Sequence, residues 1–276
     1  MRVFVLAIDG LDYYFAVKWN MKWLLQKKYG LLHISKEYYH EKLNMPYTPI
    51  IWTSIITGKK PEEHGIKEWW MWGGILDKLK WLPIIRHIRG KRKLLYALGL
   101  KPRVPNKKDL KFPTIFDIVR PSVAVNVPVY NDPTEYHEIL RDSASRGINE
   151  YVKAIREVHR MRLADLHEAL EKYKDWKLFM VYFDLIDLLT HIFITKPHII
   201  RKAYLELNRI SRKLHERLDD GNTIFLIISD HGFVLSEDGV SGKHANYAFW
   251  SININEDWHP KDFTDYFNKI LEWTRK

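Results

Sequence analysis

The strongest constraint on the fold is a run of six apolar or β-branched residues, 223–228, that ends in the sequence Ser-Asp-His-Gly. Its length and composition are typical of a strand buried on both faces. Asp230 and His231 follow, and neighbouring side chains on a straight strand point to opposite faces. The two can share one ligand only if the backbone turns, which Gly232 permits. Because ligands bind at the carboxyl ends of strands in open α/β sheets, the pair suggests metal ligation. The alternative is a turn cap followed by a surface histidine.

Other apolar runs end in the same residue types. The first run of the chain leads directly into Asp9, and the run over 177–183 is followed by Asp184, Asp187 and His191. Residues four apart lie on one face of a helical turn, so Asp187 and His191 can point the same way. The full set of candidate ligands is Asp9, Asp187, His191, Asp230, His231 and His244. Zinc, manganese and iron all accept such oxygen and nitrogen ligands.

A segment rich in proline and hydroxyl groups predicts a loop that enters a helix. We expect Thr48 at the N-cap, Pro49 as the first helical residue and Gly58 just beyond the last turn. A hydroxyl at a helix N-terminus lies among unpaired N–H groups, where phosphate binds and an alkoxide is stabilised. The alternative is that Thr48 only caps the helix. Thr53 and Ser54 fall inside the helix, where hydroxyls tend to bond back to the preceding turn.

Taken together, these motifs resemble the alkaline phosphatase superfamily, and most closely its type I phosphodiesterases and nucleotide pyrophosphatases. The resemblance covers roughly residues 1–66 and 113–256. The matching pieces occur in the family's order, which is Asp9-Gly10, Thr48, Thr57-Gly58, His64-Gly65, Asp187-x-x-x-His191, Ser229-Asp230-His231-Gly232 and His244. We expect the lone His64 to be structural or to lie behind the metal ligands, with metal ligation as the alternative.

The resemblance implies a site for two divalent metal ions, zinc first, with manganese or iron as alternatives. The residues implied for one ion are Asp187, His191 and His244, and those for the other are Asp9, Asp230, His231 and the Thr48 oxygen. Thr48 is the implied nucleophile, which attacks phosphorus and forms a phosphothreonine that water then cleaves. Two such ions can clamp the attacking and leaving oxygens.

The chain departs from this family after the His-Gly pair. Nucleotide pyrophosphatases carry an asparagine there that helps to hold a phosphoryl oxygen, whereas this sequence continues Ile-Lys-Glu-Trp. The arginine that alkaline phosphatase uses is not identifiable either. We expect backbone N–H groups at the helix start, Lys67 or Lys243 to take this role, with Lys243 and Trp52 as candidate substrate contacts. Because the chain has no cysteine, the sulfatase signature is excluded.

The expected activity is hydrolysis of phosphodiester or pyrophosphate bonds in an anionic substrate such as a nucleotide. A phosphomonoesterase or a phosphomutase on the same site is the enzymatic alternative. A nucleic-acid-binding protein is the non-enzymatic alternative, and it has no need of six converging ligands.

Positive charge is concentrated in one window. Residues 67–112 contain 13 Lys or Arg and 3 Asp or Glu, while the whole chain has a formal net charge of +10. The window also contains four tryptophans, Trp69, Trp70, Trp72 and Trp81. We interpret it as an insertion or cap that attracts anionic substrate, with nucleic acid or an anionic membrane as alternative partners. No obligate protein partner is evident.

The 276 residues suffice for one catalytic domain, 1–276, with the insertion inside it. The expected fold is α/β, with a largely parallel central sheet flanked by helices on both faces. The predicted strands are 2–8, 122–128, 177–183, 223–228 and 247–254. The predicted helices are 14–28, 49–56, 114–119, 148–173, 198–218 and 261–274. The sequence shows neither a leader peptide nor a membrane-spanning run, so we expect a cytoplasmic enzyme.

Overall fold

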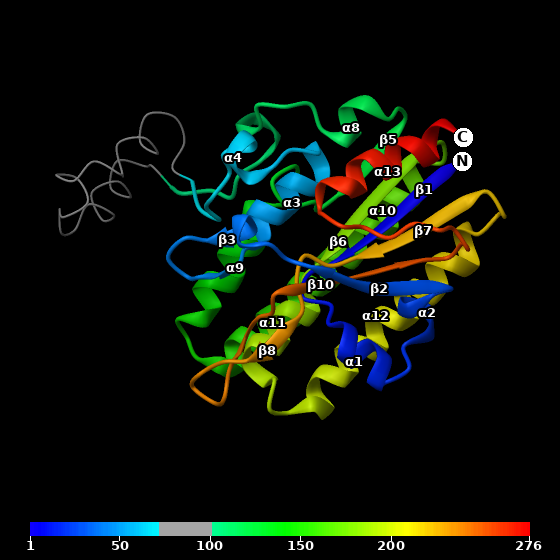
Figure 1. Ribbon diagram of the computed structural model, residues 1–276. Coiled ribbons are helices and arrows are strands. Elements are labelled where there is room, and N and C mark those ends of the chain that lie inside the picture. Colours follow the sequence, from blue (N-terminus) through cyan, green and yellow to red (C-terminus); the bar gives the residue numbers. More distant parts are fainter. Residues whose placement is uncertain (72–100) are drawn as a thin grey trace.

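A six-stranded sheet forms the centre of the computed structural model, which describes residues 1–71 and 101–276 (Figure 1). The strand order is β2-β10-β7-β1-β6-β5. Strand β10 runs opposite to the other five strands, which all point the same way. The strands are β1 Arg2–Ile8, β2 Lys28–His33, β5 Ser122–Val125, β6 Leu178–Phe183, β7 Thr223–Ile228 and β10 Tyr247–Ile252. The predicted α/β fold with a largely parallel sheet is therefore confirmed.

Helices cover both faces of the sheet because the central strands are apolar on both sides. In β6 and β7 every residue is buried, and alternate residues pack into two separate cores. One face is covered by α1 Tyr13–Lys18, α2 Lys22–Leu25, α9 Thr134–Ala144, α10 Ile148–Lys172, α11 Leu185–Phe193 and α12 Pro197–Leu218. The opposite face is covered by α3 Thr48–Thr57, α8 Ile115–Ile118 and α13 Thr264–Arg275 (Figure 1).

Short elements complete the described chain. They are η1 Lys36–Tyr38, β3 Tyr39–His40, β4 Met45–Pro46, α4 Pro61–His64, η2 Lys107–Asp109, β8 Phe233–Leu235 and β9 Gly242–His244. Pairing of β3 with β4 and of β8 with β9 forms two small antiparallel ribbons. No helix in residues 1–71 and 101–276 has the length and apolar character needed to cross a bilayer.

The helix predicted over 14–28 is wrong. Two short helices occupy its first part and the edge strand β2 begins at Lys28. Asn20 and Gln26 take positive φ values of 49° and 58°, which interrupts helical hydrogen bonding at both places. The strand predicted over 122–128 ends early for the same reason, since Asn126 has φ 57°.

The predicted basic window lies largely outside the described residues, which omit Trp72, Trp81 and the stretch between them. Its two described ends meet, because Met71 and Arg103 exchange a pair of backbone hydrogen bonds of 2.8 Å. The segments on either side of residues 72–100 therefore lie side by side. An insertion into a domain would have its two ends adjacent in this way, and the boundaries 67–112 of the insertion remain a prediction.

Candidate active site

Three parallel strands deliver acidic residues to the same edge of the sheet. Asp9 follows β1, Asp184 follows β6 and Asp230 follows β7 after one serine. The register places Ile8 beside Phe183, so the ends of β1 and β6 are level. The central sheet thus collects these carboxylates from segments far apart in the sequence.

Helix α11 begins immediately after β6 and adds two further ligands. Asp187 and His191 lie one turn apart, and the Asp187 Oδ1 to His191 Nε2 distance is 3.4 Å. The Nδ1 of His191 lies 2.8 Å from the Gly242 carbonyl oxygen, to which it donates a hydrogen bond. That bond fixes the tautomer and leaves the His191 Nε2 lone pair facing the site.

The β8–β9 ribbon brings in the last imidazole. Its register places His244 opposite Phe233, two residues after His231. The Nδ1 of His244 lies 2.8 Å from the Pro46 carbonyl and donates to it. Because Pro46 lies two residues before Thr48, this bond links the histidine to the loop that carries the predicted nucleophile.

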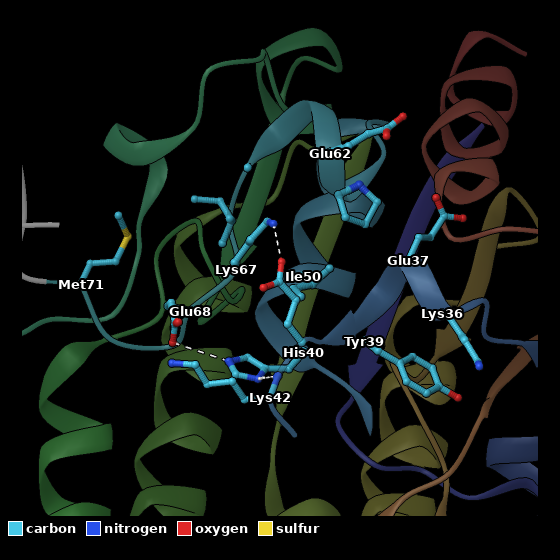
Figure 2. Close-up of a pocket in the computed structure, with 14 residues that line it drawn as sticks. Lys36, Glu37, Tyr39, His40, Lys42, Ile50, Glu62, Lys67, Glu68 and Met71 are labelled. Atoms are coloured by element: carbon cyan, nitrogen blue, oxygen red, sulfur yellow. Dashed lines mark hydrogen bonds and ion pairs between the residues drawn. The ribbon is translucent and has the colours of Figure 1, made fainter. Parts of the chain in front are cut away.

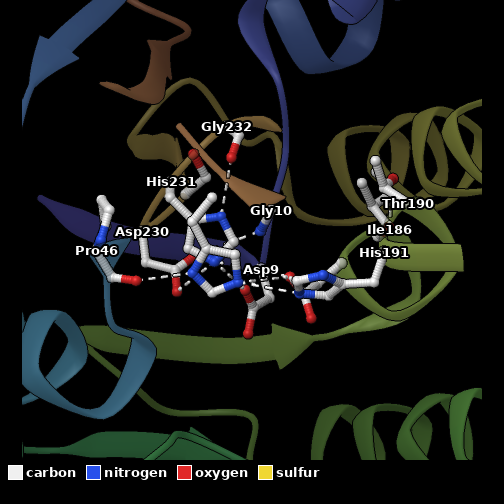
Figure 3. A network of polar contacts seen from close by, with 12 residues as sticks. Asp9, Gly10, Pro46, Ile186, Thr190, His191, Asp230, His231 and Gly232 are labelled. Atoms are coloured by element: carbon white, nitrogen blue, oxygen red, sulfur yellow. Dashed lines mark hydrogen bonds and ion pairs between the residues drawn. The ribbon is translucent and has the colours of Figure 1, made fainter. Parts of the chain in front are cut away.

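The six carboxylate and imidazole residues among the seven predicted metal ligands lie in one cluster, and Figure 3 labels four of them, Asp9, His191, Asp230 and His231. The Nε2 atoms of His191 and His244 are 3.0 Å apart, and Asp187 Oδ1 lies 3.7 Å from His244 Nε2. His231 Nε2 lies 3.3 Å from Asp9 Oδ1 and 3.5 Å from Asp230 Oδ2. A 3.7 Å contact between His231 Nε2 and Asp187 Oδ1 joins the two halves. Ligand atoms lie within 4.8 Å of one another in two groups of three, Asp9 with Asp230 and His231, and Asp187 with His231 and His244. The first group agrees with the predicted one, whereas His191 is in neither group, so its assignment to a metal ion remains a prediction.

The cluster has the unpaired atoms that a metal site requires. Four atoms of the cluster are buried and have no hydrogen-bond partner, namely Asp9 Oδ1, Asp187 Oδ1, Asp230 Oδ2 and His231 Nε2. Buried polar atoms without partners are rare and costly, so four at one place indicate a cation site. Carboxylate oxygens and imidazole nitrogens suit divalent zinc, manganese or iron. The residues present therefore fit the group that the family implies.

The electrostatics of the cluster also favour an added cation. Burial, with the charge of Asp187, raises the pKa of Asp9 well above its usual range. Burial, with the charge of Asp9, does the same to the pKa of Asp230. Burial and the neighbouring His231 lower the pKa of His244 well below its usual range. Without a cation the two carboxyl groups therefore resist ionisation, and a bound cation would stabilise their ionised, ligating form. The neutral imidazole of His244 is already the form that binds a metal ion.

Asp12, which sequence reasoning missed, holds the ligand loop in place. Its Oδ2 accepts hydrogen bonds from the Phe233 backbone N–H at 3.0 Å and from the Tyr247 hydroxyl at 2.7 Å. Phe233 in turn packs its ring against His191, His231 and His244. Only the position of Asp12, three residues after Asp9, hinted at this role.

A cavity of about 350 Å³ opens onto the cluster. Thr48 lines it together with Asp9, Asp187, His191 and His244. Thr48 is the first residue of α3, whereas the N-cap is Tyr47, so the predicted capping role of Thr48 is wrong. Within the described chain, the Thr48 hydroxyl makes no hydrogen bond of its own. It is therefore free to act on a ligand in the cavity.

The rest of the cavity wall is aromatic and carries one guanidinium. Its described residues include Tyr47, Trp69, Trp70, Arg141 and Tyr151. Burial, with the charges of Asp187 and Asp184, raises the pKa of Tyr151 to about 12. Burial and the charge of Glu68 also raise the pKa of Tyr47 to about 12. Both phenols therefore remain protonated at neutral pH and can donate hydrogen bonds.

Other predicted residues lie away from this cavity. Trp52 is fully buried and packs edge-on against Tyr182, so it has no surface with which to contact a substrate. Lys243 pairs with Glu237 at 3.1 Å and is not among the described residues that line the cavity.

His64 has a structural role. It is buried, with its Nε2 3.1 Å from the Ser54 hydroxyl, and its Nδ1 accepts from the Ile66 backbone N–H. Burial lowers its pKa to about 4, so it remains neutral at ordinary pH. It ties α4 to α3 behind the site.

A larger pocket of about 720 Å³ lies between β3, α4 and the segment that follows α4 (Figure 2). Side chains of both charges line it. Lys67 pairs there with Glu41 at 2.9 Å, and His40 Nε2 lies 3.8 Å from Glu68. Lys67 therefore belongs to this pocket and is not among the described residues of the catalytic cavity.

Comparisons with known proteins identify the family. Residues 5–247 match the family described as type I phosphodiesterase / nucleotide pyrophosphatase. A search of curated proteins found no match.

Several solved structures are similar to this chain. Murine ectonucleotide pyrophosphatase/phosphodiesterase 5 aligns over 86% of this chain and 59% of its own, with 15% identity and a TM-score of 0.50. Alkaline phosphatase from the Antarctic bacterium TAB5 aligns over 99% and 97%, with 12% identity and a TM-score of 0.50. Phosphonoacetate hydrolase from Sinorhizobium meliloti 1021 aligns over 87% and 59%, with 15% identity and a TM-score of 0.49. The chain spans about three fifths of the first and third of these proteins. By its match over residues 5–247, the chain belongs to the type I phosphodiesterase / nucleotide pyrophosphatase family.

Proposed function

We propose that this protein is a metal-dependent phosphoesterase that cleaves phosphodiester or pyrophosphate bonds with Thr48 as its nucleophile. The observation that carries the proposal is that Thr48 lines one cavity with Asp9, Asp187, His191 and His244, which belong to the cluster of six acidic and imidazole residues. Four atoms of that cluster are buried and unpaired. Family membership supports the reaction class.

Each part of the site has a defined task. Asp187, His191 and His244 would hold one divalent ion, and Asp9, Asp230 and His231 the other. When bound, such ions lower the pKa of an adjacent hydroxyl and neutralise charge on phosphoryl oxygens. Zinc is the first candidate and manganese or iron are alternatives.

The position of Thr48 as the first residue of α3 supports its role as the nucleophile, because the positive end of the helix dipole favours an oxyanion there. Backbone N–H groups contribute little, since Pro49 has none and those of Ile50 and Ile51 donate to the Tyr47 carbonyl at 3.0 and 3.1 Å. The bond from His244 to the Pro46 carbonyl holds the approach to α3 against the ligand cluster. Tyr47 and Tyr151 can donate hydrogen bonds to substrate oxygens from the cavity wall.

Replacing Thr48 with alanine tests the nucleophile. We expect hydrolysis of bis(p-nitrophenyl) phosphate to fall by at least about a thousandfold, because the attacking group is removed. Metal content, measured by mass spectrometry, should stay at the wild-type level because all six other ligands are intact. Thr48→Ser should retain part of the activity, since it keeps a hydroxyl at the same position.

Thr53→Ala is the matched control. This variant also removes a threonine hydroxyl from α3. Unlike the Thr48 hydroxyl, that of Thr53 donates to the Pro49 carbonyl at 2.6 Å and does not face the cavity. Its activity should stay within about threefold of wild type, since that hydroxyl makes one ordinary local hydrogen bond. Full activity of Thr48→Ala would remove Thr48 from the mechanism. Comparing rates on p-nitrophenyl phosphate and on its diester separates the phosphodiesterase from the phosphomonoesterase alternative.

A further inference from the structure

Arg141, on α9, contributes a positive charge to a cavity that otherwise contains acidic, imidazole, aromatic and apolar groups. It is the one Lys or Arg among the described residues that line the cavity. Neither Lys67 nor Lys243, the cations expected from the sequence, lies there. The anionic part of any ligand in this cavity therefore meets a guanidinium that the sequence motifs did not reveal.

The guanidinium is oriented by its surroundings. Its carbon lies 5.2 Å from the centre of the Trp70 ring, within the range of a cation–π contact. Its Nε lies 3.1 Å from Asp142, and one terminal nitrogen lies 3.9 Å from Glu138. Both acids are on α9 and partly exposed, so these ion pairs are weak. The remaining N–H groups can still donate to a ligand, because a guanidinium has five.

The Trp70 platform is itself supported. Trp70 lies edge-on to His137 with ring centres 6.4 Å apart, and the indole N–H of Trp69 donates to His137 Nδ1 at 3.2 Å. The other nitrogen of His137 lies 2.6 Å from Asp132, which fixes its tautomer. The tryptophan pair is thus anchored to a buried side chain. Arg141 stacks on a wall that is held in place.

Arg141 forms no ion pair with the ligand cluster among the described residues. Asp9, Asp184 and Asp187 line the same cavity, yet none of them forms an ion pair with Arg141. The phosphate that Thr48 attacks must lie against the cluster, so its charge is met there. Arg141 is available to a second anionic group on the same substrate.

We propose that Arg141 binds a second phosphate next to the one that is attacked, so that the site prefers pyrophosphate-type substrates to simple phosphodiesters. This inference rests on the proposed phosphoesterase function and specifies its substrate class. A guanidinium matches the paired oxygens of a phosphate and is the side chain best suited to this contact. Arg141 is then a specificity residue, and the attack by Thr48 does not depend on it.

The test compares two substrates that have the same aromatic arms and differ by one phosphate. They are bis(p-nitrophenyl) phosphate and bis(p-nitrophenyl) diphosphate, with products followed by absorbance and by phosphorus NMR. For Arg141→Ala we expect kcat/KM on the diphosphate to fall by about tenfold, because one partly exposed charge-assisted contact is lost. On the monophosphate diester the fall should be less than about twofold, since that substrate has no second charge to contact. Arg141→Lys should fall between, because it keeps the charge but loses the planar fork.

Arg146→Ala is the matched control. It removes an exposed arginine just beyond the end of α9, outside the described cavity lining, and should leave both substrates unaffected. Equal losses on both substrates in Arg141→Ala would overturn the selective role, and so would no loss on either. Failure of the phosphoesterase function would look different, because the wild-type protein would then hydrolyse neither substrate.

Discussion

At the scale of single residues, Gly10 shows how closely the site is packed. It follows Asp9 directly and has φ +65°, a conformation that side chains other than glycine rarely adopt. A Cβ there would lie 2.5 Å from the Phe233 ring and 3.0 Å from the Asp187 Cα. One added carbon would therefore displace both a ligand and the ring that supports three imidazoles.

Gly10→Ala separates this crowding from backbone strain. Gly221→Ala is the matched control, since Gly221 has φ +74° and a Cβ added there would meet no other atom within 4 Å. We expect the control to lower the free energy of unfolding by about 1 kcal/mol through strain alone. Gly10→Ala should cost about 2 kcal/mol more, because the clash adds to the strain, and it should weaken metal binding. Urea denaturation and metal titration measure both effects, and equal stability losses would show that the site yields to the extra carbon.

The sequence predicted the residues whose types are unusual at strand ends. Asp9, Asp230 and His231 stand out because carboxylates and histidines interrupt apolar runs. Arg141 and Asp12 carry no such signal, since a charged residue on an unrecognised helix or after a strand is ordinary. Thr48 was placed one residue wrongly because proline and threonine together suit both the cap and the first turn.

At the scale of elements, α10 is tied to the sheet by a buried charge. Arg162 is fully buried and pairs with Asp132 at 2.7 Å and with Asp184 at 2.9 Å. Its guanidinium also lies over the rings of Tyr136 and Tyr182. Tyr182 donates to Asp9 in turn. The helix is therefore connected through one arginine to the cavity wall and to a ligand.

Replacing Arg162 with methionine should destabilise the protein strongly. Two buried carboxylates would lose their cation, and removal of one partner from a buried pair costs about 3–5 kcal/mol. Arg156→Met, on the same helix, removes a half-exposed partner of Glu206 and should cost about 1 kcal/mol or less. Chemical denaturation at neutral pH compares the two variants. Similar losses would mean that solvent reaches the Arg162 network.

Long elements were predicted better than short ones. Helices α3, α10 and α12 begin and end within one residue of prediction. For α10 and α12 the apolar periodicity is sustained, whereas α3 is buried all round and was bounded by its Thr-Pro start and by Gly58. Helix α9 and the edge strand β2 were missed, and the predicted helix 14–28 overlaps β2 only at Lys28. Strand β2 alternates exposed residues with half-buried or buried ones and contains Gly30, against which Trp250 packs. Such a strand depends on its partner more than on its own composition.

At the scale of the whole molecule, buried histidines make stability depend on pH. Burial lowers the pKa of His215 to about 4, as it does for His64, whereas an unfolded histidine has a pKa of about 6.5. Above pH 6.5 the His64 and His215 side chains are neutral in both the folded and the unfolded state, so their contribution to the free energy of unfolding is then fully present. As pH falls from about 6.5 to about 4, the unfolded chain takes up protons first and stability is lost. The loss is at most about 3 kcal/mol for each histidine.

His215→Met isolates one of these contributions. The His215 Nε2 is buried without a partner and its ring stacks on Phe225, so methionine should be tolerated at pH 7. Between about pH 6.5 and 4 the variant should lose less stability than wild type, because one titrating group is gone. Urea denaturation of metal-free protein across this range tests the difference in slope. Parallel curves would show that His215 is not protonated differently on unfolding.

The central position of β1 has a consequence during synthesis. Val3 pairs with Leu178 on one side and with Ile224 on the other, so β1 is made long before either of its neighbours. While the intervening chain leaves the ribosome, β1 is an apolar segment with two unpaired edges, which is prone to aggregate. Pairing over such distances also makes folding slow. The same topology that gathers the acidic and imidazole residues at one sheet edge thus leaves β1 with an unpaired edge until β7 has been made.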